Sequence, residues 1–98
     1  MIKNQNITLN HVLAQGLGNV VSDMNGEKVI LSIDRGKYYN LGEVGGVIWD
    51  TLESRISVSD LINHLLLEYD VDKKKCEEEV ISFVEHLYKE GLIQIEER

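Results

Sequence analysis

Three histidines and one cysteine are the side chains of this sequence best suited to metal binding or nucleophilic catalysis. His11, His64 and His86 lie far apart in the chain, and neither an HxxxH nor a CxxC pair is present. A metal site would have to be assembled from lone residues, and the sequence predicts none. The acidic run Glu77 to Glu79 is interpreted as a solvated helix face rather than a paired general acid and base. The sequence therefore predicts no catalytic residues, no metal and no cofactor, and a protein that is not an enzyme.

The sequence around Cys76 supports two interpretations, a reactive thiol and a buried structural cysteine. Three lysines precede it and it falls near the start of a predicted helix, and both features lower the pKa of a thiol. Cys76 also lies on the apolar stripe of that helix, which favours a buried structural cysteine. A single cysteine cannot close an intrachain disulfide, and neither an export signal nor an apolar run of about 18 residues is visible. We therefore expect a cytoplasmic chain without a membrane partner.

Length and charge limit the class of protein further. Ninety-eight residues suit one domain, which buries roughly two thirds of the surface that its unfolded chain exposes. Ten Lys and Arg residues stand against seventeen Asp and Glu residues, for a net charge of −7. This charge repels a phosphate backbone and favours basic or apolar partners.

Strand signals dominate residues 19–33. The runs 19–24 (NVVSDM) and 27–33 (EKVILSI) flank Asn25-Gly26, the typical sequence of a type I′ hairpin. In the second run Val29, Leu31 and Ile33 share one face, and we expect that face to meet the core.

The N-terminal segment is harder to interpret. Residues 7–13 (ITLNHVL) alternate weakly between apolar and polar, and a Gly-rich turn at 16–18 follows. We therefore divide the chain into an N-terminal strand or arm over residues 1–18 and a domain over residues 19–98.

The third predicted strand, 37–41, carries two adjacent tyrosines, whose side chains must point to opposite faces of a sheet. With a three-residue turn at 34–36, Leu31 comes opposite Tyr39. This register puts Tyr39 in the core and leaves Tyr38 on the opposite face.

Three amphipathic helices are predicted after the strands. The first begins after an N-cap at Asn40 and runs to about Glu53, with Gly45-Gly46 indicating close packing. The second opens with the capping box at 57–60, and the third covers 72–90 before Gly91 ends it. Residues 92–95 add a short strand or only dock apolar side chains. The order predicts an α+β fold: a three-stranded antiparallel sheet followed by three helices, with an extra N-terminal strand if residues 7–13 pair.

A winged-helix DNA-binding regulator has similar parts and is the alternative function. Its third helix would enter the major groove. Here residues 72–90 contain four lysines and six acids, a poor surface for phosphates. A wing also commonly follows the recognition helix, whereas this predicted sheet precedes all three helices. We therefore expect no nucleic acid partner.

Three segments carry a family resemblance through their order and spacing. They are NGEKVILSIDRGKYYNLGEVGGVIWDTLE, SVSDLINHLLLEYDVD and VISFVEHLYKEGLI. This succession, within residues 19–95, resembles the PqqD-like family of small winged-helix-like domains, also called RiPP recognition elements. RiPPs are ribosomally synthesised and post-translationally modified peptides.

The resemblance implies a non-catalytic module that binds the leader peptide of a RiPP precursor and presents it to a tailoring enzyme. In the family the leader is added as an antiparallel strand beside the third strand, in a groove walled by the third helix. By position, the implied peptide-binding residues are Lys37, Tyr38, Tyr39, Asn40 and Leu41 on the strand, and Val80, Phe83, Val84 and Leu87 on the helix.

The tyrosine pair and the following Gly-x-Ile-Trp resemble the stand-alone forms that serve lasso peptide leader peptidases. The implied partner is then a separate, cysteine-protease-like leader peptidase, with another tailoring enzyme as the alternative. Residues 7–13 lie outside the shorter forms of the family. They could pair with the sheet, block its edge or form a homodimer.

Overall fold

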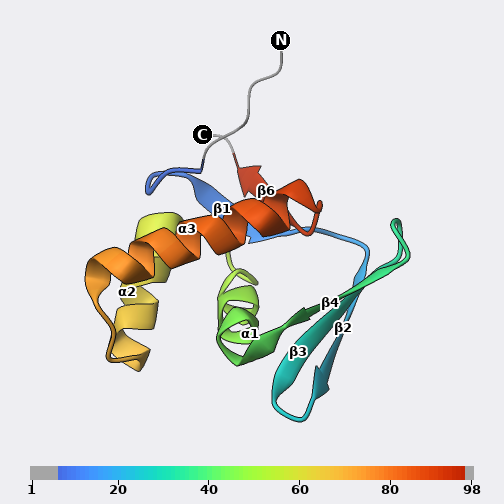
Figure 1. The fold of residues 1–98 in the computed structure, drawn as a ribbon. Coiled ribbons are helices and arrows are strands. Elements are labelled where there is room, and N and C mark those ends of the chain that lie inside the picture. The colour runs from blue at the N-terminus through green and yellow to red at the C-terminus, as the bar shows by residue number, and fades with distance from the viewer. Residues whose placement is uncertain (1–6, 97–98) are drawn as a thin grey trace.

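The computed structural model describes residues 7–96, which form two small sheets and three helices (Figure 1). The first six residues of the predicted arm lie outside this range. The elements are β1 (Val12–Gln15), β2 (Asn19–Met24), β3 (Glu27–Ser32), β4 (Lys37–Leu41), α1 (Gly42–Thr51), β5 (Ile56–Ser57), α2 (Val58–Glu68), α3 (Lys73–Lys89) and β6 (Ile93–Glu96).

The sheets confirm the predicted α+β architecture and add a second sheet to it. β2, β3 and β4 form one antiparallel sheet in that order, and β5, β1 and β6 form the other. In Figure 1, α3 runs across the molecule with β1 and β6 near its C-terminal end, while the β2–β3–β4 sheet extends away from α1. No helix in the described range is long and apolar enough to cross a membrane.

The first hairpin forms as predicted. Asn25 and Gly26 have φ angles of 57° and 85°, the left-handed values that a type I′ turn requires. Met24 pairs with Glu27 directly beside the turn, and the ladder continues to Asn19 and Ser32.

The predicted register of β3 against β4 is wrong by one residue. Ser32 pairs with Lys37, so the loop has four residues, and Ile30 rather than Leu31 lies opposite Tyr39. The core face of β3 is therefore formed by Ile30 and Ser32, whereas Val29, Leu31 and Ile33 face away from the core.

A buried serine explains the error. The backbone N–H of Arg35 donates to Ser32 Oγ at 3.3 Å, and the N–H of Gly36 donates to the Ser32 carbonyl at 2.7 Å. Ser32 is thus a turn-capping residue, and its hydroxyl is satisfied although it is buried. Both registers place Tyr39 toward the core and Tyr38 away from it.

The helix ends are mostly as predicted, with one correction. Asn40 is not the N-cap of α1, because it belongs to β4 and its Oδ1 accepts from the Gly42 N–H at 2.9 Å. Leu41 takes the N-cap position without a side-chain bond. Ser57 caps α2 and Asp72 caps α3, each accepting a backbone N–H at 3.0 Å. Gly91 ends α3 with a φ of 79°.

Close packing at Gly45 and Gly46 is confirmed. A Cβ on Gly45 would lie 2.8 Å from Phe83 Cζ, and a Cβ on Gly46 would lie 2.9 Å from Lys28 Cβ. Lys28 Nζ in turn contacts Asp23 Oδ1 and Asp50 Oδ1, both at 3.1 Å. A side chain at Gly46 would therefore push α1 away from the first hairpin, whereas one at Gly45 would meet Phe83 of α3.

The N-terminal segment and the last strand pack on each other. β1 pairs along its whole length with β6, and the Gly16 N–H donates to the Leu92 carbonyl at 2.8 Å. Of the two predictions for residues 92–95, a short strand or only docked apolar side chains, the strand is confirmed as β6. The division of the chain at residue 18 stays a prediction.

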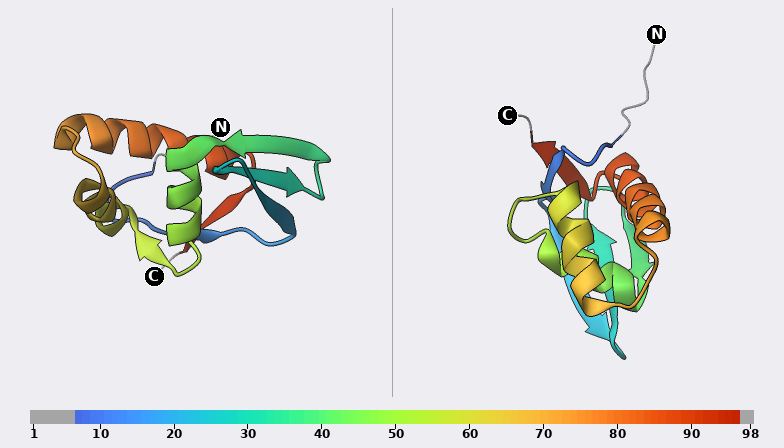
Figure 2. Two further views of the ribbon diagram at one scale, coloured as in Figure 1. Left: turned by 90° about the horizontal axis from the view of Figure 1, so that it is seen from below. Right: turned by 90° about the vertical axis from the view of Figure 1, so that its left-hand side faces the viewer.

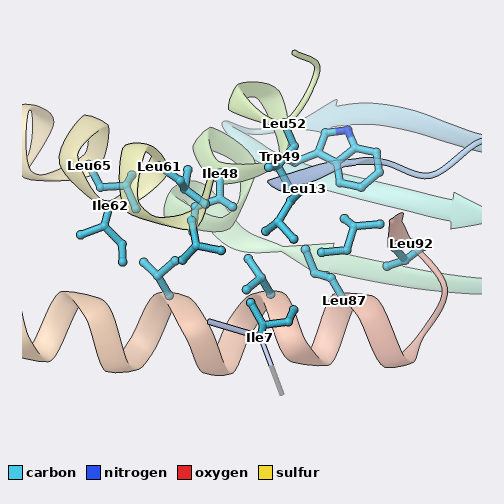
Figure 3. Packing of buried hydrophobic residues seen from close by; sticks show 14 of the residues in the cluster. Ile7, Leu13, Ile48, Trp49, Leu52, Leu61, Ile62, Leu65, Leu87 and Leu92 are labelled. Atoms are coloured by element: carbon cyan, nitrogen blue, oxygen red, sulfur yellow. The ribbon is translucent and has the colours of Figure 1, made fainter. Parts of the chain in front are cut away.

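The hydrophobic core is shared by all three helices and by β1. Leu13 of β1 lies beside Trp49 and Leu52, while Leu61 of α2 and Leu87 of α3 face them (Figure 3). Because Leu13 and Trp49 belong to the same buried cluster, β1 helps to position α1, from which the candidate site is built.

Candidate functional site

β4 is an edge strand. It pairs with β3 on one side, and no strand in the described range pairs with its other side. The left view of Figure 2 shows β4 and α3 along the same side of the molecule, with α1 extending from the end of β4. A row of backbone N–H and C=O groups is therefore available along β4.

The first hairpin determines which residues present those groups. A two-residue type I′ turn closes on a pair that exchanges both backbone bonds, and here that pair is Met24 and Glu27. Bonding alternates along a strand, so Ile30 and Ser32 turn their backbone groups toward β4. Their partners Tyr39 and Lys37 are thereby occupied. Tyr38 and Asn40 direct their N–H and C=O groups to the open edge.

An apolar pocket of about 380 Å³ lies at the C-terminal end of β4. Leu41 of β4, Val44 and Ile48 of α1, and Val80 and Phe83 of α3 supply most of its apolar wall. Lys75 and Glu79 are its charged lining residues. The pocket is thus shared by the edge strand, α1 and α3, and Leu65 of α2 with Tyr69 and Val71 beyond it completes the lining.

A polar cluster joins the other end of β4 to the end of α3. The Tyr39 hydroxyl donates to Glu90 Oε1 at 2.7 Å, and the same oxygen lies 3.7 Å from Arg35 Nη1 and 3.9 Å from Lys37 Nζ. The hydrogen bond from Tyr39 lowers the pKa of Glu90, and the two cations lower it further. The same bond raises the pKa of Tyr39. The groove between β4 and α3 therefore has an apolar end and a charged end.

The structure brings together most, but not all, of the nine predicted peptide-binding residues. Residues 37–41 form the edge strand, and Val80 and Phe83 line the pocket at its end. Val84 and Leu87 are fully buried in the core and do not reach the groove. Of the four α3 residues that the resemblance implied as the wall, two are thus covered by the core.

Sequence reasoning missed other parts of the groove. Val44 of α1 was not among the predicted binding residues, yet it is exposed and lines the pocket. Arg35 and Glu90 were not recognised as neighbours of the edge. The three-residue spacing from Leu41 to Val44 is a signal that could have found the pocket, because such residues share a helix face.

Cys76 is a structural residue. Its side chain is buried, and burial raises the pKa of the thiol, with Glu79 and Glu77 adding to the effect. The buried structural cysteine that the apolar stripe favoured is therefore confirmed, and the adjacent lysines do not lower the pKa of the thiol. The described residues contain no group of three His, Cys, Asp or Glu side chains placed to hold a metal ion.

The outer face of the β2–β3–β4 sheet carries exposed apolar side chains. Val20, Leu31 and Tyr38 lie in one row across the three strands, and Tyr38 is 75% exposed. Met24 and Ile33 are also exposed apolar residues of this hairpin sheet. Exposed apolar side chains that gather on one face of a sheet can mark an interaction site. We call these five residues the outer patch.

The sequence matches the family model of coenzyme PQQ synthesis protein D (PqqD) over residues 27–93, more than half of the chain. No curated protein sequence is significantly similar to it.

Two solved structures share the fold. One is TbiB1 in complex with the TbiA(beta) leader peptide, which is 26% identical with a TM-score of 0.74, over 83% of this chain and 94% of that chain. The other is a lasso peptide synthetase B1 complexed with its leader peptide, which is 22% identical with a TM-score of 0.74, over 84% of this chain and 96% of that chain.

Proposed function

Because this chain belongs to the PqqD family, we propose that it is a non-catalytic module that binds the leader peptide of a RiPP precursor. The observation that carries the proposal is the open edge of β4, which lies directly beside an apolar pocket. The similar TbiB1 structure contains a bound leader peptide, which supports the same class of ligand here.

The leader binds as an antiparallel strand against β4. Its backbone pairs with the N–H and C=O groups of Tyr38 and Asn40, which supply affinity for any extended peptide. Leader side chains opposite Tyr39 and Leu41 point into the groove toward α3, since opposed residues of neighbouring strands share a face. Selectivity arises there, in the pocket formed with Val44 and Phe83.

The pocket is large enough to hold apolar anchoring side chains of the leader. Its volume of about 380 Å³ is near the lower end of the range of roughly 300–1,000 Å³ typical of small-molecule sites. Apolar leader residues that fill it gain about 25 cal/mol for each Å² removed from water.

The enzyme that receives the leader is a separate lasso peptide leader peptidase, and it docks on the outer patch. The leader occupies the edge and the groove side of β4, which leaves the outer face of the same strand accessible. Tyr38 is central to this arrangement, because its backbone faces the leader while its side chain belongs to the patch. One strand thus contacts both partners.

A binding experiment with two ligands tests the proposal. We expect a fluorescein-labelled leader peptide of the cognate precursor to bind saturably with a Kd of about 1 μM or below. A labelled DNA duplex should not bind, because the chain carries a net charge of −7. Fluorescence anisotropy across a salt series measures both. DNA binding that weakens steeply with salt, with no leader binding, would overturn the proposal.

Replacing Val20 by glutamate tests the outer patch separately. Val20 is 50% exposed on β2, away from the edge that binds the leader. We expect Val20→Glu to keep its leader affinity within about twofold and to slow leader removal by the peptidase about tenfold, because a charge in an apolar contact is costly.

Leu67→Glu is the matched control for Val20→Glu. It also replaces an apolar residue by an added negative charge, at a position on α2 that is 88% exposed. It should leave both leader affinity and leader removal unchanged. Equal cleavage rates for the two variants would place the peptidase elsewhere.

A further inference from the structure

Two cations stand at the charged end of the β4 edge, opposite to the apolar pocket. We propose that Arg35 and Lys37 bind a carboxylate side chain of the incoming peptide, so that this site selects an apolar residue followed four positions later by Asp or Glu. The inference rests on the proposed function and specifies the class of peptide that the site accepts.

The two cations have incomplete partners. Both lie near Glu90 Oε1, but at 3.7 Å and 3.9 Å, beyond hydrogen-bond distance, and the short bond of that oxygen goes to Tyr39. Their side chains are 46% and 58% exposed. Within the described range Asp34 forms no ion pair with either. Two positive charges therefore share the single carboxylate of Glu90. A second carboxylate, supplied by the peptide, would neutralise the remaining positive charge.

The strand sets the spacing between the two subsites. Lys37, Tyr39 and Leu41 alternate with the outward residues of β4, so their side chains share the groove face. Lys37 and Leu41 are four residues apart, or about 13 Å along a strand. A peptide antiparallel to β4 places its residue near the pocket first and its residue near Lys37 four positions later.

The charge of the whole chain makes the local contact selective. With a net charge of −7, the protein repels acidic peptides at long range, so an acid is favoured only where it reaches these cations directly. Charge-assisted hydrogen bonds between guanidinium or ammonium groups and a carboxylate are stronger than neutral ones. An acid placed opposite Leu41 would meet the mostly apolar pocket instead.

Selection of displayed random peptides on the immobilised full chain tests the spacing. Wild-type protein should enrich peptides with an apolar residue followed four positions later by Asp or Glu. The Arg35→Gln/Lys37→Gln variant should enrich the same apolar residue without the acid. Arg55→Gln is the control for lost charge, since Arg55 pairs with Glu96 in the second sheet, and it should behave as wild type.

The outcomes separate this inference from the proposed function. If no extended peptide is enriched, the proposed function fails. If peptides with the apolar residue are enriched but the acid is absent, or precedes the apolar residue, only the present inference fails.

Affinities of one selected peptide give the size of the effect. Changing its acid to the amide should weaken binding to wild-type protein about five- to tenfold, and should change nothing for Arg35→Gln/Lys37→Gln. Thermal unfolding of each variant checks that the fold is kept. An equal loss for both proteins would show that the acid acts somewhere other than at these cations.

Discussion

Tyr38→Pro should lose about a hundredfold or more of its affinity for an extended leader peptide and still fold. Proline has no N–H, so a peptide carbonyl loses its donor at the open edge, and the ring occupies space that the added strand needs. A lost bond and an unsatisfied carbonyl together cost about 3 kcal/mol, or about a hundredfold in Kd. The fold tolerates the change because the N–H of Tyr38 faces away from β3.

Two further variants show whether the backbone is responsible. Tyr38→Ala keeps the N–H and removes the same side chain, so it should retain most of the affinity measured by anisotropy. Tyr39→Pro removes a donor that bonds to Ile30 inside the sheet, so it should lower the midpoint of urea unfolding. If Tyr38→Pro binds as well as Tyr38→Ala, the leader is not added as a strand at this edge.

Leu13→Ala should destabilise the protein by about 2–5 kcal/mol, the usual cost of removing a buried leucine side chain. Leu13 is 0% exposed in β1, the central strand of the β5–β1–β6 sheet. Its loss leaves a cavity beside the α1 residues that fix the pocket, so leader affinity should fall as well once the folded fraction drops. Urea unfolding followed by Trp49 fluorescence measures the change.

Leu17→Ala is the matched control, because it is the same substitution four residues along the chain at a side chain that is 87% exposed. Its effect should stay within about 0.5 kcal/mol. If the two variants were equally stable, the N-terminal segment would be a dispensable arm and the division at residue 18 would hold. A large difference would make β1 part of the domain, although the family match begins only at residue 27.

The sequence predicted those features that local chemistry decides. The cap Ser57 bonds to an N–H group three residues away, and the Asn25-Gly26 turn needs only its own two φ angles. The register of β3 against β4 is not decided by local chemistry in this way, because both faces of β3 carry apolar residues. The deciding contact was a buried serine that caps the next loop, which a polarity pattern reads as a surface residue.

The same limit applies to the candidate site. The edge strand followed from the order of the elements and from a family resemblance, and its residues are as predicted. The groove walls depend on packing between distant segments, which decides that Val84 is covered and Val44 is not. The Tyr39–Glu90 bond joins residues 51 positions apart, and no spacing rule predicts it.

The unequal ends of β4 also bear on how the protein behaves at high concentration. An open strand edge can pair with the same edge of another molecule, which is a route to aggregation. Two copies of β4 aligned antiparallel about Tyr39 would set Lys37 of each molecule against Leu41 and the apolar pocket of the other. That mismatch would place two ammonium groups against mostly apolar surface, at a cost in desolvation. Because β4 is polar at one end and apolar at the other, two copies of it pair unfavourably. A sample without leader should therefore not dimerise through this edge.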